Sequence, residues 1–227
     1  MGRITAAAHG VGARMGWDLA HAAGNVDLKL NEWGPDFAAW CSYKYLNSGP
    51  GSVSGVFVHE RHHRDKELHR FAGWWGHNKE RRFLMEPGFD PIESAEAWQL
   101  SNAPVFAMAP HLASLHQFDR MDLQDRAAKR RHLTGYLEFV IDAVADKHKA
   151  TFEIITPSEP AKRGSQLSVL MHGQGKELFD RLTEKGVIAD WREPNVIRMA
   201  PVPMYNSYED VYRFGLYLDE ALTELNA

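Results

Sequence analysis

The sequence predicts an α/β fold followed by a smaller α+β domain, and three observations support this. Short apolar segments of strand length alternate with helical patterns through the first part of the chain. After residue 150, short strands and helices follow one another more closely. The 227 residues are 44% hydrophobic, which suits one large domain or two small ones. We therefore expect one domain at residues 1–150 and a second at 151–227.

The strands of the first domain are predicted from apolar runs and the turn residues between them. After the end of a helix at 4–12, strands are expected at 15–19, 37–46 and 54–59. The last two are joined by the glycine- and proline-rich segment Asn47–Ser52, where the chain must turn. We therefore expect the segment before this turn to lie close to a hairpin.

Two helices are predicted to complete the first domain. Ser101 and Asn102 precede Pro104 in the pattern of a helix start, with a capping side chain before a proline in the first turn. This helix should run to about residue 117. A second helix is indicated by apolar residues at helical spacing, namely Leu133, Leu137, Val140, Ile141 and Val144.

The second domain is expected to combine short strands with two helices. Strands are predicted at 151–155, 166–171, 187–191 and 196–199, and a helix at 176–185. Gly186 should end that helix. Ser207 and Asp210 have the spacing of a capping box, which predicts the start of the last helix.

Charge and composition exclude several classes of function. The net charge is −4 with acidic and basic residues intermixed, so we expect no nucleic-acid partner and no membrane anchor. No apolar run approaches the roughly 20 residues of a membrane span, and the first residues do not resemble a signal peptide, so a cytoplasmic protein is expected. Cys41 is the single cysteine, which excludes an intrachain disulfide framework.

One histidine pattern could suggest a metal. The segment from His59 to His63 has the spacing of a zinc-protease motif, with Glu60 after the first histidine. The motif needs both histidines inside one helix, whereas His59 directly follows a predicted strand. No third ligand is evident on a following helix. We therefore expect no metal site.

Lys44 is the most informative residue, because it ends an apolar, aromatic-rich strand and precedes a glycine-rich turn. A buried lysine is a candidate for amine chemistry such as a Schiff base. The plain alternative is an edge-strand lysine whose stem packs while its ammonium reaches water. Asp18 favours the chemical interpretation, because it ends another apolar strand and both ends can converge at the carboxyl edge of an α/β sheet. Pyridoxal phosphate needs this pair: a lysine to bind it and a carboxylate to keep its ring nitrogen protonated.

Five sequence blocks extend this pair into a family resemblance. They are Asp18–Asn25, Trp40–Asn47, Gly73–His77, Leu100–Asn102 and Ile197–Pro203. In this order they resemble the carboxyl-terminal half of kynureninase, a pyridoxal-phosphate enzyme of the aspartate aminotransferase-like fold type I superfamily. The resemblance implies that residues 1–150 form the carboxyl-terminal part of a cofactor-binding large domain with a mixed, mostly parallel sheet. Residues 151–227 would then form its small α+β domain.

The resemblance also implies roles for four residues around the expected cofactor. Lys44 would form the Schiff base and act as the base at the substrate's α-carbon. Asp18 would pair with the pyridinium nitrogen, and His21 would help to fix the ring. Tyr43 would reach the phosphate and pass protons near Lys44. Taken alone, Asp18 and His21 also fit a strand-end carboxylate and a helix cap, and Tyr43 also fits ordinary packing.

Three further residues match family positions at a distance from the lysine. Trp74 would face the cofactor or substrate in a region shaped by the dimer partner, although it could be ordinary core. Asn102 would touch the cofactor and the aryl substrate, although it could be a plain helix cap. Arg198 would grip the substrate carboxylate, a task suited to a planar bidentate donor, although it could be a surface charge.

The implied activity is hydrolysis of kynurenine or 3-hydroxykynurenine to anthranilate or 3-hydroxyanthranilate plus alanine. This reaction belongs to tryptophan catabolism and NAD biosynthesis, and the small-molecule amino acid is the expected substrate of a homodimer. Family members extend well beyond this length on the amino-terminal side. The alternative is therefore a half-enzyme, or an inactive remnant, that needs a separate amino-terminal chain for cofactor binding and activity.

Overall fold

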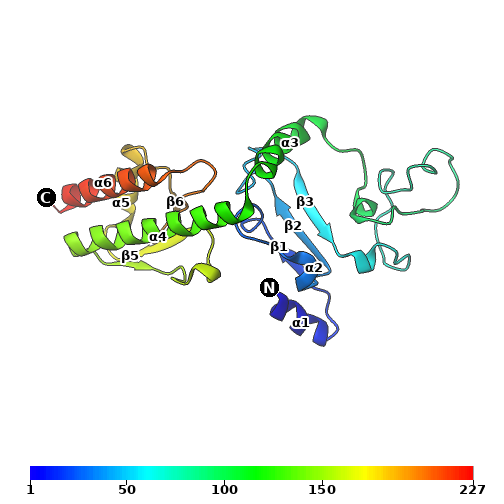
Figure 1. Cartoon of the computed structure of the whole chain (residues 1–227), viewed down its shortest axis with the longest axis horizontal. Helices are drawn as coiled ribbons and strands as arrows, with labels where there is room; N and C mark the ends of the chain where they lie inside the picture. The colour runs from blue at the N-terminus through cyan, green and yellow to red at the C-terminus, as the bar shows by residue number, and fades with distance from the viewer. Residues whose placement is uncertain (227) are drawn as a thin grey trace. The chain divides into compact units, whose positions relative to one another are not determined.

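The computed structural model describes residues 1–226, which form two compact units, 1–120 and 121–226 (Figure 1). This division falls before the domain boundary expected at residue 150. The physical reason is helix α4 (Leu123–His148), which packs against the carboxyl-terminal helix α6 (Tyr208–Leu225) and contributes its apolar face to the core of the second unit. The two units are described separately below.

The first unit is built on a three-stranded sheet with the order β1-β2-β3. The strands are β1 (Gly16–Asp18), β2 (Phe37–Cys41) and β3 (Ser54–Val58). Strand β2 runs parallel to β1 and antiparallel to β3, so the sheet is mixed. Three helices accompany it: α1 (Gly2–Gly10), α2 (Leu30–Trp33) and α3 (Val105–Asp119). Two short 3-10 turns lie at Glu60–His62 and Ala95–Trp98.

Two local predictions for this unit were wrong. Strand β2 ends at Cys41 instead of residue 46, because the backbone then bends: the Ser42 hydroxyl donates to Val53 O at 2.5 Å, and Ser48 N–H donates back to Ser42 O. Helix α3 begins after Pro104 with no side-chain cap. The Ser101 hydroxyl donates instead to the Asn102 side-chain oxygen at 3.1 Å, so Asn102 is not the helix cap.

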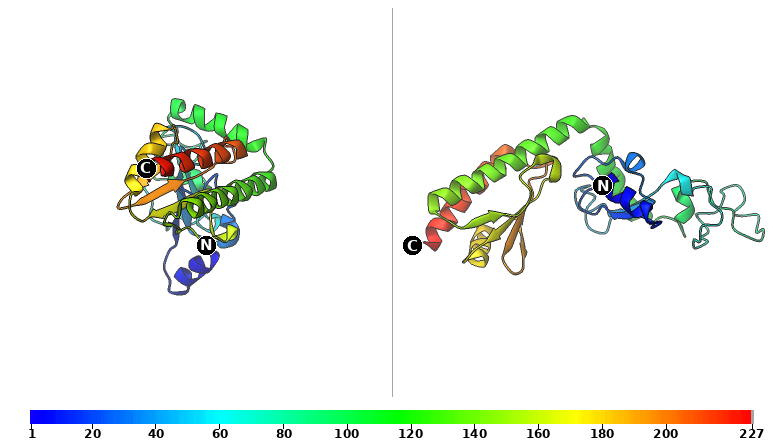
Figure 2. Two further views of the ribbon diagram at one scale, coloured as in Figure 1. Left: turned by 90° about the vertical axis from the view of Figure 1, so that its left-hand side faces the viewer. Right: turned by 90° about the horizontal axis from the view of Figure 1, so that it is seen from below.

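The second unit has a four-stranded antiparallel sheet with the order β4-β5-β7-β6. Its strands are β4 (Phe152–Ile154), β5 (Leu167–Met171), β6 (Asp190–Arg192) and β7 (Val196–Met199). Strand β6 begins later than the strand predicted at 187–191. Helix α5 (Gly175–Glu184) lies between β5 and β6 in the chain, and α6 begins with the predicted Ser207–Asp210 capping box. Figure 2 shows α4 and α6 side by side along this unit.

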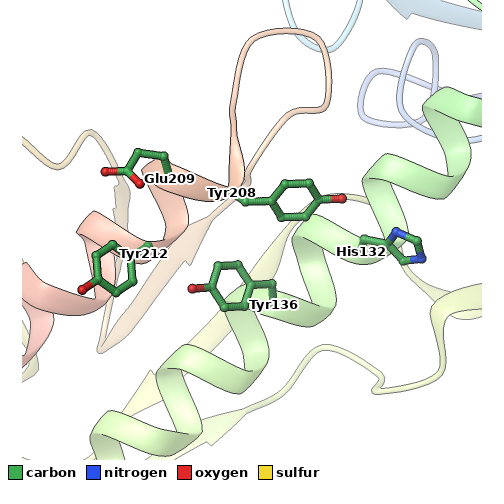
Figure 3. A pocket seen from close by; sticks show the side chains of 5 residues that line it. All are labelled: His132, Tyr136, Tyr208, Glu209 and Tyr212. Carbon is green, nitrogen blue, oxygen red and sulfur yellow. The ribbon is translucent and has the colours of Figure 1, made fainter.

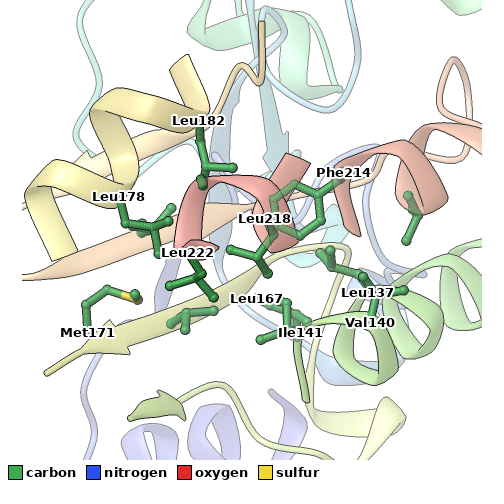
Figure 4. Close-up of a cluster of buried hydrophobic side chains, with 14 of the residues drawn as sticks. Leu137, Val140, Ile141, Leu167, Met171, Leu178, Leu182, Phe214, Leu218 and Leu222 are labelled. Atoms are coloured by element: carbon green, nitrogen blue, oxygen red, sulfur yellow. The ribbon is translucent and has the colours of Figure 1, made fainter. Parts of the chain in front are cut away.

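A single apolar core holds the second unit together. Leu133, Leu137 and Ile141 of α4 are fully or almost fully buried, as the helical spacing predicted. Figure 4 shows the leucines of α5 and α6 facing the apolar residues of α4 and β5. Burying a leucine side chain contributes about 1.5–3 kcal/mol, so this cluster is the main source of stability for the unit.

A buried carboxylate ties the first unit together at the start of β2. Asp36 accepts hydrogen bonds from the Met15 N–H at 2.6 Å and pairs with His62 Nε2 at 2.7 Å and His9 Nε2 at 2.9 Å. The Arg61 guanidinium lies 3.3 Å away. Burial raises the pKa of Asp36, but the hydrogen bonds from Met15, His9 and His62 and the charge of Arg61 outweigh it, so the pKa lies well below its ordinary value.

We expect Asp36→Asn to destabilise the first unit by about 3 kcal/mol, because it leaves buried donors and cations without their anion. Since the folded pKa is lowered, the stability contributed by Asp36 is present above its ordinary pKa of about 4 and is lost as pH falls further. Urea unfolding followed from about pH 7 down to pH 3 measures both effects. The exposed Glu32→Gln serves as the control. An Asp36→Asn chain as stable as the wild type, with the same pH dependence, would contradict this assignment.

Candidate active site

Asp18 and the segment that carries Lys44 leave the first sheet at the same edge. Strands β1 and β2 are parallel and adjacent, with Gly16 opposite Phe37 and Asp18 opposite Ala39. Because the carboxyl ends of parallel neighbours lie on one edge, the two segments start from neighbouring points. The sequence argument that these strand ends would share an edge is therefore confirmed for this pair of strands.

The segments that follow these strands also contact one another. Gly24 lies with a positive φ of 79° against the backbone of Tyr45, where an added Cβ would come within 2.6 Å of the Tyr45 carbonyl oxygen. The rings of His21 and Tyr45 meet edge to face, with centroids 6.3 Å apart. Only glycine allows this close approach at position 24. The contact holds the loop of Asp18 and His21 against the loop of Lys44.

Lys44 lies in a turn, and its side chain is half-buried. Its Nζ lies 5.8 Å from the centroid of the Tyr43 ring, and its carbonyl accepts the N–H of Asn47, whose φ of 58° completes the turn. The buried Asn47 amide nitrogen has no hydrogen-bond partner among the described residues. The Tyr43 ring is about half exposed, at 52%.

Helix α3 fixes this turn from the other side. The Ser48 hydroxyl pairs with His111 Nδ1 at 2.7 Å, and the Ser114 hydroxyl donates to the Leu46 carbonyl. Ser48 and Ser114 are both buried. Sequence reasoning missed these contacts, because they join residues far apart in the chain that show no shared pattern.

Asp18 presents its carboxylate at the exposed end of β1. Its Oδ1 accepts the N–H of Ala20 at 2.8 Å, which holds the side chain in a tight turn. A shallow hollow of about 540 Å³ runs over this face of the sheet and is lined by Asp18, Trp17, Ala39 and Cys41, among others. Of the predicted site residues, only Asp18 lines this hollow.

Trp74 and the segment before Asn102 pack together elsewhere in the first unit. An added Cβ at Gly73 would lie 2.3 Å from the Leu100 Cα, so these two sequence blocks are in direct contact. Trp74 is 49% exposed, and its ring meets Phe83 edge to face with centroids 5.4 Å apart. Asn102 is exposed. Trp74 is therefore not a core residue within this unit.

Arg198 belongs to the second unit, on β7, one of the two central strands of its sheet. Ile197 points into the core, so Arg198 lies on the opposite face of the sheet. Its Nε donates to Asp190 Oδ2 at 2.5 Å, and its Nη2 forms an ion pair with the same oxygen. Asp190 lies directly opposite on β6. The sequence did not single out Asp190, because the register of two short strands is not visible in it.

The zinc-like histidine pattern has a different structural use. His59 caps a 3-10 turn by accepting the Arg61 N–H, and burial lowers the pKa of His59, as does the Arg61 charge. His62 pairs with Asp36, and His63 Nε2 lies 3.0 Å from the Val58 carbonyl oxygen. Among residues 1–226 no group of three potential metal ligands occurs.

No helix in the same range is long and apolar enough to span a membrane.

A second hollow lies on the second unit between α4 and α6. Figure 3 shows its lining, which consists of His132, Tyr136, Tyr208, Glu209 and Tyr212. The rings of Tyr136 and Tyr208 have centroids 6.4 Å apart. None of the residues predicted to act in chemistry lines it.

Comparison with known proteins shows what this chain is similar to. A family model described as the kynureninase C-terminal domain matches residues 127–218. The kynureninase of Flavobacterium johnsoniae is 62% identical over 96% of this chain and 52% of that protein. The kynureninase of Koribacter versatilis is 53% identical over 94% of this chain and 50% of that protein. The chain matches the carboxyl-terminal half of kynureninases. It spans about half the length of the curated relatives it matches.

Solved structures agree with the predicted fold class. The cysteine desulfurase CsdA of Escherichia coli has a TM-score of 0.73 over 98% of this chain and 55% of that chain, at 17% identity. A C-DES variant with glycine covalently linked to its PLP cofactor has a TM-score of 0.68 over 88% of this chain and 49% of that one, at 16% identity. At these identities the likeness shows the fold alone. The expected fold class, part of a PLP-dependent transferase-like fold, is confirmed.

Proposed function

We propose that this chain carries the lysine half of a kynureninase-type active site, which hydrolyses kynurenine or 3-hydroxykynurenine to anthranilate or 3-hydroxyanthranilate plus alanine. One observation carries the proposal: Asp18 and the Lys44 segment follow adjacent parallel strands and their loops contact one another. The kynureninases that match nearly the whole chain support it. The implied place in tryptophan catabolism and NAD biosynthesis follows from the same family.

The residues at this edge fit pyridoxal phosphate in their chemistry. An exposed carboxylate comes from Asp18, which lines the open hollow over the sheet. A primary amine and a phenol hydroxyl come from Lys44 and Tyr43 on the neighbouring loop, which does not line that hollow. Gly24 packs directly against the backbone of Tyr45. A side chain at position 24 would push the two loops apart. When bound, pyridoxal phosphate supplies an electron sink for the substrate's α-carbon. Tyr43 is the donor that we assign to its phosphate.

Each residue would then act at a stated atom. Asp18 would hold the proton on the ring nitrogen through its carboxylate, and His21 would help to fix the ring. Lys44 Nζ would bind the cofactor covalently and take the proton from the substrate's α-carbon. The Tyr43 hydroxyl would supply a proton to the cleaved alanine fragment. Trp74 and Asn102 would contact the aryl part of the substrate, and Arg198 its carboxylate.

We also propose that activity requires further protein beyond these residues. Strand β1 is at an edge of its sheet, and exposed apolar residues include Phe83, Met85 and Phe106, which is 94% exposed. Open strand edges and apolar surface favour association with another polypeptide. The partner would be the amino-terminal half of a kynureninase, joined in a dimer in the cytoplasm. The alternative is a chain that associates in this way but is inactive.

A complementation experiment tests the proposal. The purified chain is mixed with pyridoxal phosphate and kynurenine, with and without the amino-terminal half of the Flavobacterium johnsoniae relative. Anthranilate fluorescence reports turnover, and light scattering after gel filtration reports mass. We expect negligible turnover by the chain alone and an increase of at least about tenfold when the second half is added. A stable monomer with full activity alone would contradict the partner requirement. A stable complex without turnover would favour the inactive alternative.

A further inference from the structure

The outer face of the second sheet places one carboxylate between two arginines. Asp190 Oδ2 pairs with Arg198 through Nε and Nη2, and with Arg192 Nε at 3.0 Å. Asp190 and Arg198 are directly opposite on β6 and β7, and Ser168 of β5 is opposite Arg198 on its other side. The register therefore holds the pair without a turn or loop.

The contacts with Asp190 occupy the Nε and Nη2 edge of the Arg198 guanidinium and leave its other edge open. A guanidinium can bind a carboxylate through its Nε and Nη2 edge or through its two terminal nitrogens. Asp190 takes the first of these edges with a single oxygen. Within residues 1–226, Nη1 of Arg198 makes no hydrogen bond or ion pair. The Arg198 side chain is 25% exposed, so part of it can be reached from solvent.

Fixing this side chain has a consequence for binding. A free arginine side chain loses conformational entropy when it is ordered by a ligand, and this loss weakens binding. A carboxylate that orders the guanidinium beforehand removes much of that loss. Arg192 shares Asp190, which limits the extent to which Asp190 neutralises the charge of Arg198. The cluster of Asp190, Arg192 and Arg198 therefore keeps one net positive charge for an anionic ligand.

We infer that Asp190 is a positioning residue, which holds Arg198 so that its two terminal nitrogens bind the α-carboxylate of the amino-acid substrate. This inference rests on the proposed function, because it needs Arg198 to be the carboxylate-binding residue. It goes further in assigning the edge of the guanidinium that binds and the residue that orients it.

The first test measures the geometry without activity. The Nε–H signal of Arg198 in the nitrogen-15 NMR spectrum is assigned by its loss in Arg198→Lys. We expect this proton to exchange slowly with water in the wild type and at least about tenfold faster in Asp190→Ala, because the acceptor is gone. Arg192→Ala is the matched control, since it removes the other partner of Asp190 and leaves the Arg198 bond. An unchanged exchange rate in Asp190→Ala would overturn the inference.

The second test uses the complemented enzyme with kynurenine. We expect Asp190→Ala to raise KM about tenfold with kcat within twofold, and Asp190→Glu to restore part of the loss. Arg192→Ala should raise KM less than Asp190→Ala, because Arg198 keeps its orienting partner. Inhibition by decarboxylated kynurenine, which lacks the carboxylate, should be the same for wild type and Asp190→Ala. Equal weakening of that inhibitor would indicate a merely structural role.

Arg198→Lys distinguishes the proposed role of Arg198 in binding the carboxylate from the proposed role of Asp190 in orienting Arg198. We expect it to raise KM at least as much as Asp190→Ala, because a point charge does not replace a planar fork. If Arg198→Lys leaves KM unchanged in an active preparation, the proposed role of Arg198 fails. If Arg198→Lys raises KM and Asp190→Ala does not, only the role of Asp190 fails.

Discussion

Lys44→Ala is expected to reduce kynurenine turnover by at least about 10³-fold, because a general base alone contributes about 10² to 10⁴ and the covalent bond to the cofactor is lost with it. The fold should be unaffected. The Lys44 side chain is half-buried and lies over the Tyr43 ring, while the turn is closed by backbone hydrogen bonds and by helix α3. The measurement is anthranilate production by the complemented enzyme.

Chemical trapping locates the reactive amine independently of turnover. Borohydride reduces an imine to a stable amine, so treatment with pyridoxal phosphate and borohydride should label the peptide containing Ser42 to Asn47. Lys44→Ala should lose this label. Lys29→Ala is the control, because Lys29 is exposed and paired with Glu32. A label found mainly on another lysine would show that Lys44 is not the amine.

The parts of the fold that were predictable from sequence depend on strong local patterns. Helix α4 has buried residues at regular helical spacing, from Leu133 to Ile141, and its apolar face alone identifies it. The start of α6 was predicted from Ser207 and Asp210, because a capping box is a local pair of hydrogen bonds. The sharing of one edge by Asp18 and the Lys44 segment followed from a general rule about parallel strands.

The parts that were not predictable depend on contacts between distant segments. The early end of β2 follows from hydrogen bonds of Ser42 to Val53 and Ser48, which the apolar run through Leu46 conceals. The pairing of Asp190 with Arg198 needs the register of two strands that are each shorter than five residues. A sequence pattern of period two cannot set the register of such short strands.

The second large loss of activity is expected for Asp18, whose local geometry allows its charge to be removed without disturbing the turn. Asp18→Asn keeps the side-chain oxygen that accepts the Ala20 N–H, so the turn after β1 should persist. What is lost is the negative charge at the position that we propose faces the ring nitrogen. Removing one preorganised electrostatic group typically lowers kcat by about 10² to 10³. We therefore expect a loss of that size in kcat, with a small change in KM.

The pattern across variants distinguishes the charge of Asp18 from a general disturbance of the site. Asp18→Asn should still be labelled at Lys44 by pyridoxal phosphate and borohydride, whereas Lys44→Ala should lose both label and turnover. Asp65→Asn is the matched control, because Asp65 Oδ1 also accepts the N–H two residues later but lies outside the proposed site. Asp18→Glu, which keeps the charge on a longer stem, should recover part of the rate. Turnover by Asp18→Asn within about threefold of wild type would remove Asp18 from the mechanism, because a charge that controls the electron demand of the ring cannot be neutralised without a loss of rate.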